Sequence, residues 1–504
     1  MQVSSRWSWI LVLISSLATA QTPEQKTARY FDLIRKQPTL LLAFLHQMPK
    51  GADLHNHLSG ALYAEDMIDW AVSDNLCVDR TTSRVLAPPC DACEHYTPKP
   101  AIRCAYDDHI LYNQIIDAWS MRNWRPGEES GHDHFFATFD KFALAAHMHT
   151  AEAIASVANR AGEEGVQYIE FMLTPDDAAS AKLAAQTEWD DSLPHMREKL
   201  LSGGLKEIAT ATSKTLADDD AKAHAEMKCG TPEAEPGCKV TIRYLYQVLR
   251  ALPPPAVFAQ ILLGFELASS DPHFVGLNLV QPEDWYVPIH DFHQHMAMLD
   301  YLHGVYPKVH IALHAGELAA GLVKPEDLTY HIRESVERGH AERIGHGASI
   351  MLEKDAIGLM KEMAARNVMV EINFTSNDLI LGISGDDHPL PIYIKYGVPV
   401  ALSTDDEGVA RSDMTHEYFR AEGFHLSYTE LKNMARTSLE HSFLPGQSLW
   451  ISVKGSFKPA PACTADVRGA TKPSSACGKF LDTNERAREQ WKLEAAFAGF
   501  EKSF

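Results

Sequence analysis

Short apolar runs alternate with longer amphipathic segments along the chain from Gly51 onward. The short runs have the length of buried strands, and the longer segments, such as residues 151–162 and 355–366, carry apolar residues at helical spacing. This alternation is typical of parallel sheets, and eight short runs predict a closed (β/α)8 TIM barrel. The expected strands are residues 52–58, 166–173, 240–248, 261–267, 309–314, 343–346, 368–373 and 398–403.

Two stretches interrupt this alternation. Residues 74–134, rich in Cys and Pro, fall between the first and second expected strands, and residues 190–238 precede the third. We interpret both as insertions in one barrel domain that spans residues 21–504. Extra helices are expected at both ends: Thr22, Pro23 and Gln25 form a helix-start pattern, and residues 484–498 are amphipathic.

The first twenty residues predict a signal peptide. Arg6 is their only charged side chain, an apolar stretch follows from Trp9 to Leu17, and Ala18-Thr19-Ala20 has the small residues of a cleavage site. The apolar stretch is short for a membrane span, which favours a cleaved signal over an anchor. We therefore expect an exported protein, periplasmic or secreted, without membrane contact after cleavage.

Charge and cysteine content narrow the function classes. The chain has 67 acidic and 46 basic residues, a net charge of −21, and no basic run that would offset it, so nucleic acid is not an expected partner. In an exported protein, eight cysteines predict disulfides rather than a metal cluster. Cys229/Cys238 and Cys463/Cys477 look like local pairs. The remaining four allow three pairings, which the sequence leaves open: Cys77, Cys90, Cys93 and Cys104.

Polar residues gather where the expected strands end. His55 and His57 lie two residues apart, so both imidazoles point to the same side of the first strand. Three further strands end in the same manner, and the carboxyl ends of barrel strands meet at one mouth, where active sites lie. The residues at those ends are His314 and Glu317, His346, and Asp405 and Asp406.

Three imidazoles and one carboxylate, from His55, His57, His314 and Asp405, suit a divalent metal, with Zn²⁺ as the first choice. Zinc lowers the pKa of a bound water from 15.7 to about 7. Glu317 would then serve as a general acid and base, and His346 would orient or deprotonate the water. Because neighbouring strand residues point to opposite sides, we expect one aspartate on the metal and the other on the substrate.

Simpler interpretations compete with this site. The chain has 25 histidines, so accidental pairs at polar strand ends are expected. Asp406 also suits the N-cap of a following helix.

Four motifs resemble those of the metal-dependent adenosine deaminase family of the amidohydrolase superfamily. They are MPKGADLHNHLSG (48–60), HAGE (314–317), RIGHG (343–347) and STDDEG (403–408). The lead-in MPKG, the signal peptide and the cysteine-containing insertion are similar to the secreted adenosine deaminase-like growth factor branch. The sequence before Met48 is too short for that branch's N-terminal dimerisation domain, so growth-factor behaviour is not implied.

The resemblance implies one Zn²⁺ per subunit on His55, His57, His314 and Asp405. It further implies Glu317 as proton donor to the purine ring, His346 beside the attacking hydroxide, and Asp406 bonded to purine N7. The reaction would convert adenosine to inosine and ammonia, and 2′-deoxyadenosine would react in the same way.

Two positions depart from the family pattern. Ser59 stands where many members have an Asp that contacts the ribose 5′-hydroxyl. In many members the fourth strand ends in Asp-Leu-Ala-Gly, and the backbone of that Gly contacts purine N3. Ser269 stands at the position of this Gly in the expected fourth strand. Other adenine-based substrates therefore stay open.

Three alternatives compete with this function. Residues 89–93 have the P-C-x-x-C form of the zinc deaminases of nucleic-acid bases, but the H-x-E half should precede them and follows instead. An amidohydrolase of the same fold could act on another C–N bond. An exported nucleoside-binding or signalling protein with a vestigial site would be expected to have lost Glu317 or a ligand, and all are present.

Overall fold

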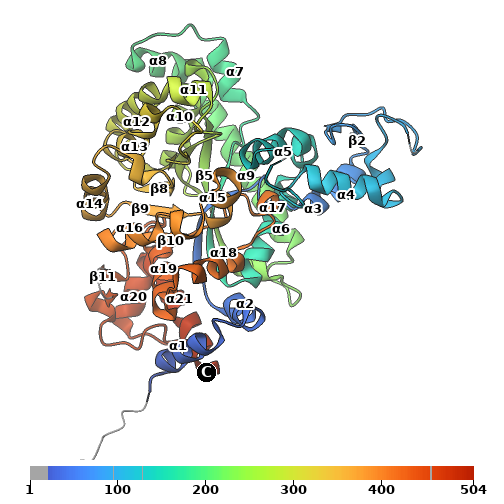
Figure 1. Ribbon diagram of the computed structural model, residues 1–504. Coiled ribbons are helices and arrows are strands. Elements are labelled where there is room, and N and C mark those ends of the chain that lie inside the picture. The colour runs from blue at the N-terminus through green and yellow to red at the C-terminus, as the bar shows by residue number, and fades with distance from the viewer. Residues whose placement is uncertain (1–20, 95, 128, 454–456) are drawn as a thin grey trace, which may run out of the picture.

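Eight parallel strands form a nearly closed barrel with helices around it (Figure 1). The computed structural model describes residues 21–94, 96–127, 129–453 and 457–504. The barrel order is β1-β4-β5-β6-β7-β8-β9-β10, and each neighbouring pair is parallel. These strands are β1 Gly51–His57, β4 Val166–Leu173, β5 Thr241–Leu249, β6 Phe274–Val280, β7 His310–Ala315, β8 Arg343–His346, β9 Met369–Ile372 and β10 Val400–Leu402. The predicted (β/α)8 barrel, with insertions after its first two strands and extra terminal helices, is confirmed.

The seam of the barrel closes beyond the end of β10. The backbone N–H of Asp405 donates to the carbonyl of His55 at 2.8 Å, and the N–H of His57 donates to the carbonyl of Asp405 at 3.2 Å. Asn56 and Asp405 thereby form a parallel bridge. Residues predicted as metal ligands thus also join the last strand to the first.

The predicted fourth strand, residues 261–267, is wrong. These residues lie inside α10 (Pro254–Ser270), and the fourth barrel strand is β6. Helix α10 contacts β5 and β6 on one side and α7 (Ala179–Ala185) and α9 (Lys206–Glu226) on the other, so it is apolar around most of its circumference. A short apolar run in such a helix cannot be distinguished by periodicity from a buried strand.

Helices and insertions fill the connections between the strands. The first connection carries a two-stranded hairpin, β2 (Cys77–Val78) with β3 (Val85–Leu86), and the second carries a π-helical turn. The helices of these two connections are α3 Ala64–Ser73, α4 His109–Ala118, α5 Gly131–Ala146, α6 Thr150–Glu163, α7, α8 Leu193–Leu200 and α9. The later barrel connections carry α10, α11 Tyr286–His290, α12 Phe292–Val305, α13 His331–Glu337, α14 Ala356–Arg366, α15 Phe374–Leu381 and α16 Leu390–Tyr396.

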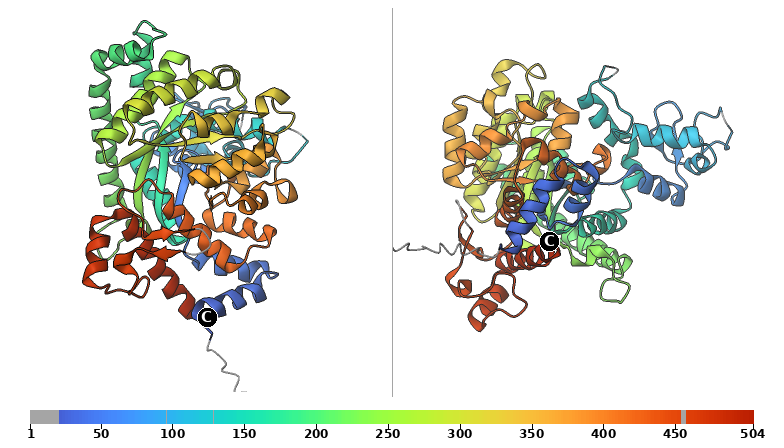
Figure 2. Two further views of the ribbon diagram at one scale, coloured as in Figure 1. Left: turned by 90° about the vertical axis from the view of Figure 1, so that its left-hand side faces the viewer. Right: turned by 60° about the horizontal axis from the view of Figure 1, so that its bottom comes forward.

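The first helices described, from residue 23 on, and the last helix of the chain pack together below the barrel (Figures 1 and 2). The leading helix α1 (Pro23–Ile34) starts with the expected capping box of Thr22 and Gln25. Rings of α1 and α2 (Pro38–Gln47) contact Phe500 and Phe504. The segments after the barrel are α17 Glu407–Ala410, α18 Met414–Ala421, α19 Tyr428–Glu440, β11 Trp450–Ser452, β12 Lys458–Pro459, α20 Ser475–Thr483 and α21 Glu485–Phe500.

All eight cysteines form disulfides. The predicted pairs Cys229–Cys238 and Cys463–Cys477 are confirmed, and the open pairing resolves as Cys77–Cys90 and Cys93–Cys104. The predicted signal peptide, residues 1–20, lies outside the described residues. Within the described ranges, no helix is both long and apolar enough to cross a membrane.

Candidate active site

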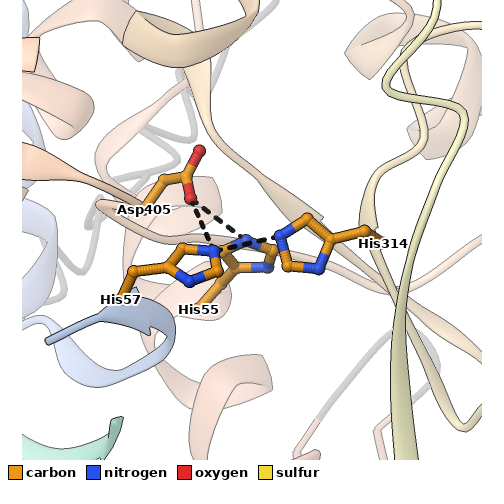
Figure 3. A group of neighbouring side chains, drawn as sticks. All are labelled: His55, His57, His314 and Asp405. Carbon is orange, nitrogen blue, oxygen red and sulfur yellow. Dashed lines mark hydrogen bonds and ion pairs between the residues drawn. The ribbon is translucent and has the colours of Figure 1, made fainter. Parts of the chain in front are cut away.

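Four side chains converge at the mouth of the barrel (Figure 3). The Nε2 atoms of His57 and His314 lie 3.0 Å apart, and Asp405 Oδ1 lies 3.2 Å from His55 Nε2 and 3.4 Å from His57 Nε2. One nitrogen or oxygen from each residue lies within 4.8 Å of the others, and all four residues are buried. The predicted ligands from strands 1, 5 and 8 are therefore together in space.

Each of the three imidazoles is held from behind by an oxygen atom. The Nδ1 atom of His55 lies 2.7 Å from Glu371 Oε2, that of His57 lies 2.8 Å from Gln247 Oε1, and that of His314 lies 2.9 Å from Asn278 Oδ1. Because these oxygens accept hydrogen bonds, each Nδ1 carries the proton and each Nε2 presents its lone pair to the centre. That tautomer is the one a metal ion requires.

A metal ion fits these residues. His55 Nε2 and Asp405 Oδ1 are buried without a hydrogen-bond partner among the described residues, which is costly unless a further group satisfies them. Burial and the neighbouring imidazoles lower the pKa of His314 well below its ordinary value, so the imidazole is neutral, as a ligand must be. Three nitrogens and one carboxylate are a donor set for a divalent transition metal.

A buried ion-pair network extends behind the site. Arg343 lies 2.6 Å from both Glu170 and Glu371, and its guanidinium stacks over Phe443 at 3.8 Å. Glu371 therefore bridges Arg343 and His55 with its two oxygens. The carboxylate charge, rather than a neutral partner, faces the imidazole and supports its orientation.

Glu317 and His346 lie beside the four ligands, as predicted. His346 Nε2 lies 3.7 Å from Glu317 Oε1 and 3.7 Å from Asp405 Oδ2, and its Nδ1 lies 3.0 Å from Asn377 Oδ1. Burial raises the pKa of the Glu317 carboxyl above its ordinary value, against the opposing effect of His346. A raised pKa favours the protonated form of the carboxyl, from which Glu317 can donate a proton.

Asp405 and Asp406 both line the same cavity. The expectation that the two aspartates point to opposite sides of a strand is wrong, because Asp405 has φ of 60° and is not strand backbone. Asp406 precedes α17, but its side chain caps no N–H of that helix, which disfavours the N-cap interpretation. Burial and the charge of Asp405 raise the pKa of Asp406 well above its ordinary value.

Gly60 makes room for Asp406. A Cβ atom at position 60 would lie 1.6 Å from Asp406 Oδ1, a distance that no rearrangement short of moving the aspartate could relieve. The glycine of the HNHLSG motif is therefore needed for the position of a residue almost 350 positions away in the sequence.

A cavity of about 460 Å³ opens onto these residues. Ser59, exposed, lies in its lining, and the substrate contact expected for it stays a prediction. One wall belongs to α5, which ends the first insertion and contributes Phe135, Phe136 and Phe139. The sequence reasoning missed this helix because the expected insertion boundary at residue 134 divided it.

Ser269 is not part of the site, so its predicted role is wrong. It lies in the last turn of α10, exposed, where its hydroxyl donates to the carbonyl of Phe265 at 2.7 Å. The fourth strand, β6, ends at Val280, and the next residue, Gln281, lines the cavity with φ of 80°. Gln281, and not Ser269, therefore follows the fourth strand, the kind of position at which the resemblance implied glycine.

The orienting residues were also missed by the sequence reasoning. Asn278 and Glu371 each stand alone as a polar residue within an apolar strand, and Gln247 lies between the buried residues Tyr246 and Val248 of β5. Since buried polar groups are hydrogen-bonded, an isolated polar residue in a buried strand was the available signal.

Comparison with known proteins identifies related sequences and folds. Adenosine deaminase of Salmonella heidelberg (strain SL476) is 36% identical over 137 residues, which are 27% of this chain and 38% of that protein's length. An amidohydrolase from Burkholderia ambifaria with bound Zn is 16% identical in sequence. The structural match covers 80% of this chain and 88% of that protein, with a TM-score of 0.53. The N6-mAMP deaminase of Arabidopsis shares 18% identity, with 80% and 96% covered and a TM-score of 0.51.

The structural likenesses establish the barrel fold. The sequence profile of the family described as adenosine deaminase matches residues 113–449, about two thirds of the chain. That region contains His314, Glu317, His346, Asp405 and Asp406, which meet His55 and His57 at one mouth. The chain belongs to the adenosine deaminase family.

Proposed function

We propose that this protein is an exported, zinc-dependent deaminase that converts adenosine, and 2′-deoxyadenosine, to the corresponding inosine and ammonia. The observation that carries the proposal is the convergence of a His3Asp donor set with Glu317 and His346 on one cavity. The curated relative named adenosine deaminase and the fold relative with bound Zn support the substrate and the metal.

The residues around the cavity divide the chemistry among them. His55, His57, His314 and Asp405 would hold a zinc ion, which would lower the pKa of a water molecule at the site from 15.7 to about 7. Glu317 donates its proton to a ring nitrogen of the purine, which makes C6 electrophilic. His346 accepts a proton from the attacking water, and Asp406 binds N7. The water oxygen replaces the amino group at C6, the amino group takes up the proton held by His346 and leaves as ammonia, and the remaining proton of the water returns to Glu317.

The lining of the cavity favours an uncharged substrate. It contains Asp133, Asp140, Glu317, Asp405 and Asp406, and none of its described members is Lys or Arg. A phosphate group in the cavity would lie near carboxylates and would have no guanidinium or ammonium group to pair with. Repulsion between the like charges makes this contact unfavourable. We therefore propose nucleosides rather than nucleotides as substrates, with other adenine-based compounds or another C–N bond as the alternative.

Export is proposed from the first twenty residues and is supported by the four disulfides, which are typical of oxidising compartments. The mature protein is expected in a periplasm or outside the cell. Its oligomeric state is left open.

A substrate panel tests the proposal. Purified, zinc-loaded protein is incubated with adenosine, 2′-deoxyadenosine, AMP and adenine, and ammonia is measured. We expect release from the first two and at least a hundredfold lower kcat/KM for AMP. Equal turnover of AMP would contradict the nucleoside class. Adenosine binding without ammonia from any member of the panel would favour a vestigial binding protein.

A further inference from the structure

A five-residue turn after β6, residues 281–285, contacts three separate parts of the site. Its first residue holds the end of β5: the N–H of Ala251 donates to Gln281 Oε1 at 2.9 Å, and Arg250 Nε donates to the carbonyl of Gln281 at 2.8 Å. Arg250 also donates to the carbonyl of the ligand His314 at 3.2 Å. The turn is thereby tied to the metal-ligand strands.

The third residue of the turn holds the backbone of the proton donor. The carboxylate of Glu283, fully buried, accepts the N–H of Glu317 at 2.8 Å and the N–H of Gly316 at 3.2 Å. His331 fixes the same carboxylate at 2.5 Å. Burial opposes ionisation of Glu283, but His331 and Arg250 outweigh it and lower the pKa. The position of Glu317 thus depends on Glu283.

The fourth residue of the turn binds the insertion helix. Asp284 Oδ1 lies 2.9 Å from Nε2 of His132, in the first turn of α5, and His132 is only 8% exposed. The same α5 places Phe135, Phe136 and Phe139 along the cavity. Its start is seated tightly, since a Cβ atom at Gly131 would lie 1.8 Å from the carbonyl oxygen of Leu379 in α15.

We propose that residues 281–285 couple the insertion helix α5 to the general acid: the His132–Asp284 pair fixes the turn, and Glu283 in the turn fixes Glu317. His132 and Asp284 are then positioning residues for proton donation, although neither has to touch the reacting atoms. The first insertion is on this account required for turnover as well as for substrate binding. The catalytic part of the inference rests on the proposed deaminase function.

The test uses four variants of the full chain: His132→Gln, Asp284→Asn, the double variant that combines them, and Glu129→Gln as the matched control. Glu129 pairs with His134 at 2.9 Å, next to His132 on the same helix, but that pair does not contact the turn. We expect each of the first two variants to lower kcat about tenfold with a smaller change in KM, as a displaced catalytic group does. The kcat of the double variant should be no lower than that of the less active single variant, because each substitution removes the same His132–Asp284 bond. The control should match wild type.

Amide hydrogen exchange provides a readout that does not depend on turnover. Peptides that contain Gly316 and Glu317 should exchange faster in His132→Gln and Asp284→Asn, with zinc content and exchange in β4 unchanged. Unchanged exchange at these two amides would overturn the coupling whether or not adenosine is a substrate. Active wild type with fully active Asp284→Asn would overturn the catalytic part. Wild type without activity on any purine would overturn the proposed function, while the exchange result would still decide the coupling.

Discussion

Nδ1 of His55 lies 2.7 Å from Oε2 of Glu371, and both side chains are fully buried. The second oxygen of Glu371 lies 2.6 Å from Nε of Arg343, so the carboxylate cannot turn away. Replacing Glu371 with Gln should weaken zinc binding about 10–100-fold, because it removes the charged partner that orients the imidazole. Competition with a chromophoric chelator measures the affinity.

Glu342→Gln is the matched control for this experiment. Glu342 pairs with His310 at 2.7 Å at the opposite end of the barrel, where the carboxylate is half exposed. The Glu342→Gln substitution should leave the zinc affinity unchanged. Equal affinity of the Glu371→Gln protein and wild type would show that the network does not support the ligand.

Gly60→Ala should displace Asp406 without disturbing the metal ligands. The added Cβ would occupy the space of Asp406 Oδ1, so the aspartate must move. We expect kcat/KM for adenosine to fall about a hundredfold, as is typical when a substrate-positioning group shifts by 1 Å, with zinc content unchanged. Gly304→Ala, at a position with open space around it, is the control. Full activity of Gly60→Ala would argue against a role for Asp406.

Removal of the metal should lower thermal stability. A metal that binds only the folded state adds about 4 kcal/mol at a thousandfold excess over its Kd. The effect should reach the whole barrel, because the backbone of Asp405 closes the seam with β1. Calorimetry after chelator treatment should show a lower Tm that zinc, but not magnesium, restores. An identical Tm with and without chelator would contradict a structural contribution from the metal.

The His132–Asp284 pair should make a pH-dependent contribution to stability. Burial lowers the pKa of His132, but hydrogen bonds to Asp284 and Asp133 and the charge of Glu317 outweigh this and raise it to about 9. Since folding raises this pKa from its ordinary 6.5, the contribution is complete below about pH 6.5 and is lost as the pH rises through 9. Water still reaches 10% of the His132 side chain and 15% of that of Asp284, so we take the contribution of the pair as about 1 kcal/mol at most.

Comparison of wild type with His132→Gln isolates this contribution. The Tm of the variant should lie about 1–2 °C below wild type at pH 6, and the two values should coincide near pH 10. A difference that is the same at both pH values would show that the ion pair does not stabilise the fold.

The barrel and the metal ligands could be predicted from the sequence because strand ends carry strong local signals. His55 and His57 obey the two-residue period of a strand, and HAGE and STDDEG follow apolar runs. In a barrel, every such end faces the same mouth, so a linear pattern was enough to collect the residues.

The parts that could not be predicted depend on tertiary packing. The run 261–267 is apolar because other elements cover α10 on both sides. Its own sequence does not reveal that coverage. Because of that error the end of the fourth strand was placed at Ser269, whereas Gln281 follows the actual strand and lines the cavity. The bonds of Glu371 and Glu283 to the site join segments far apart in the chain, and the pairing of the four clustered cysteines required their positions in space.

The most direct test of the central claim follows the ultraviolet spectrum of adenosine, together with ammonia release, in the presence of protein carrying one zinc ion per chain. We predict conversion to the spectrum of inosine with equimolar ammonia. Glu317→Gln should retain the zinc but lose about 10²–10⁴-fold in kcat, because its proton donor is absent. No spectral change with zinc-loaded wild type, or equal activity in Glu317→Gln, would contradict the account.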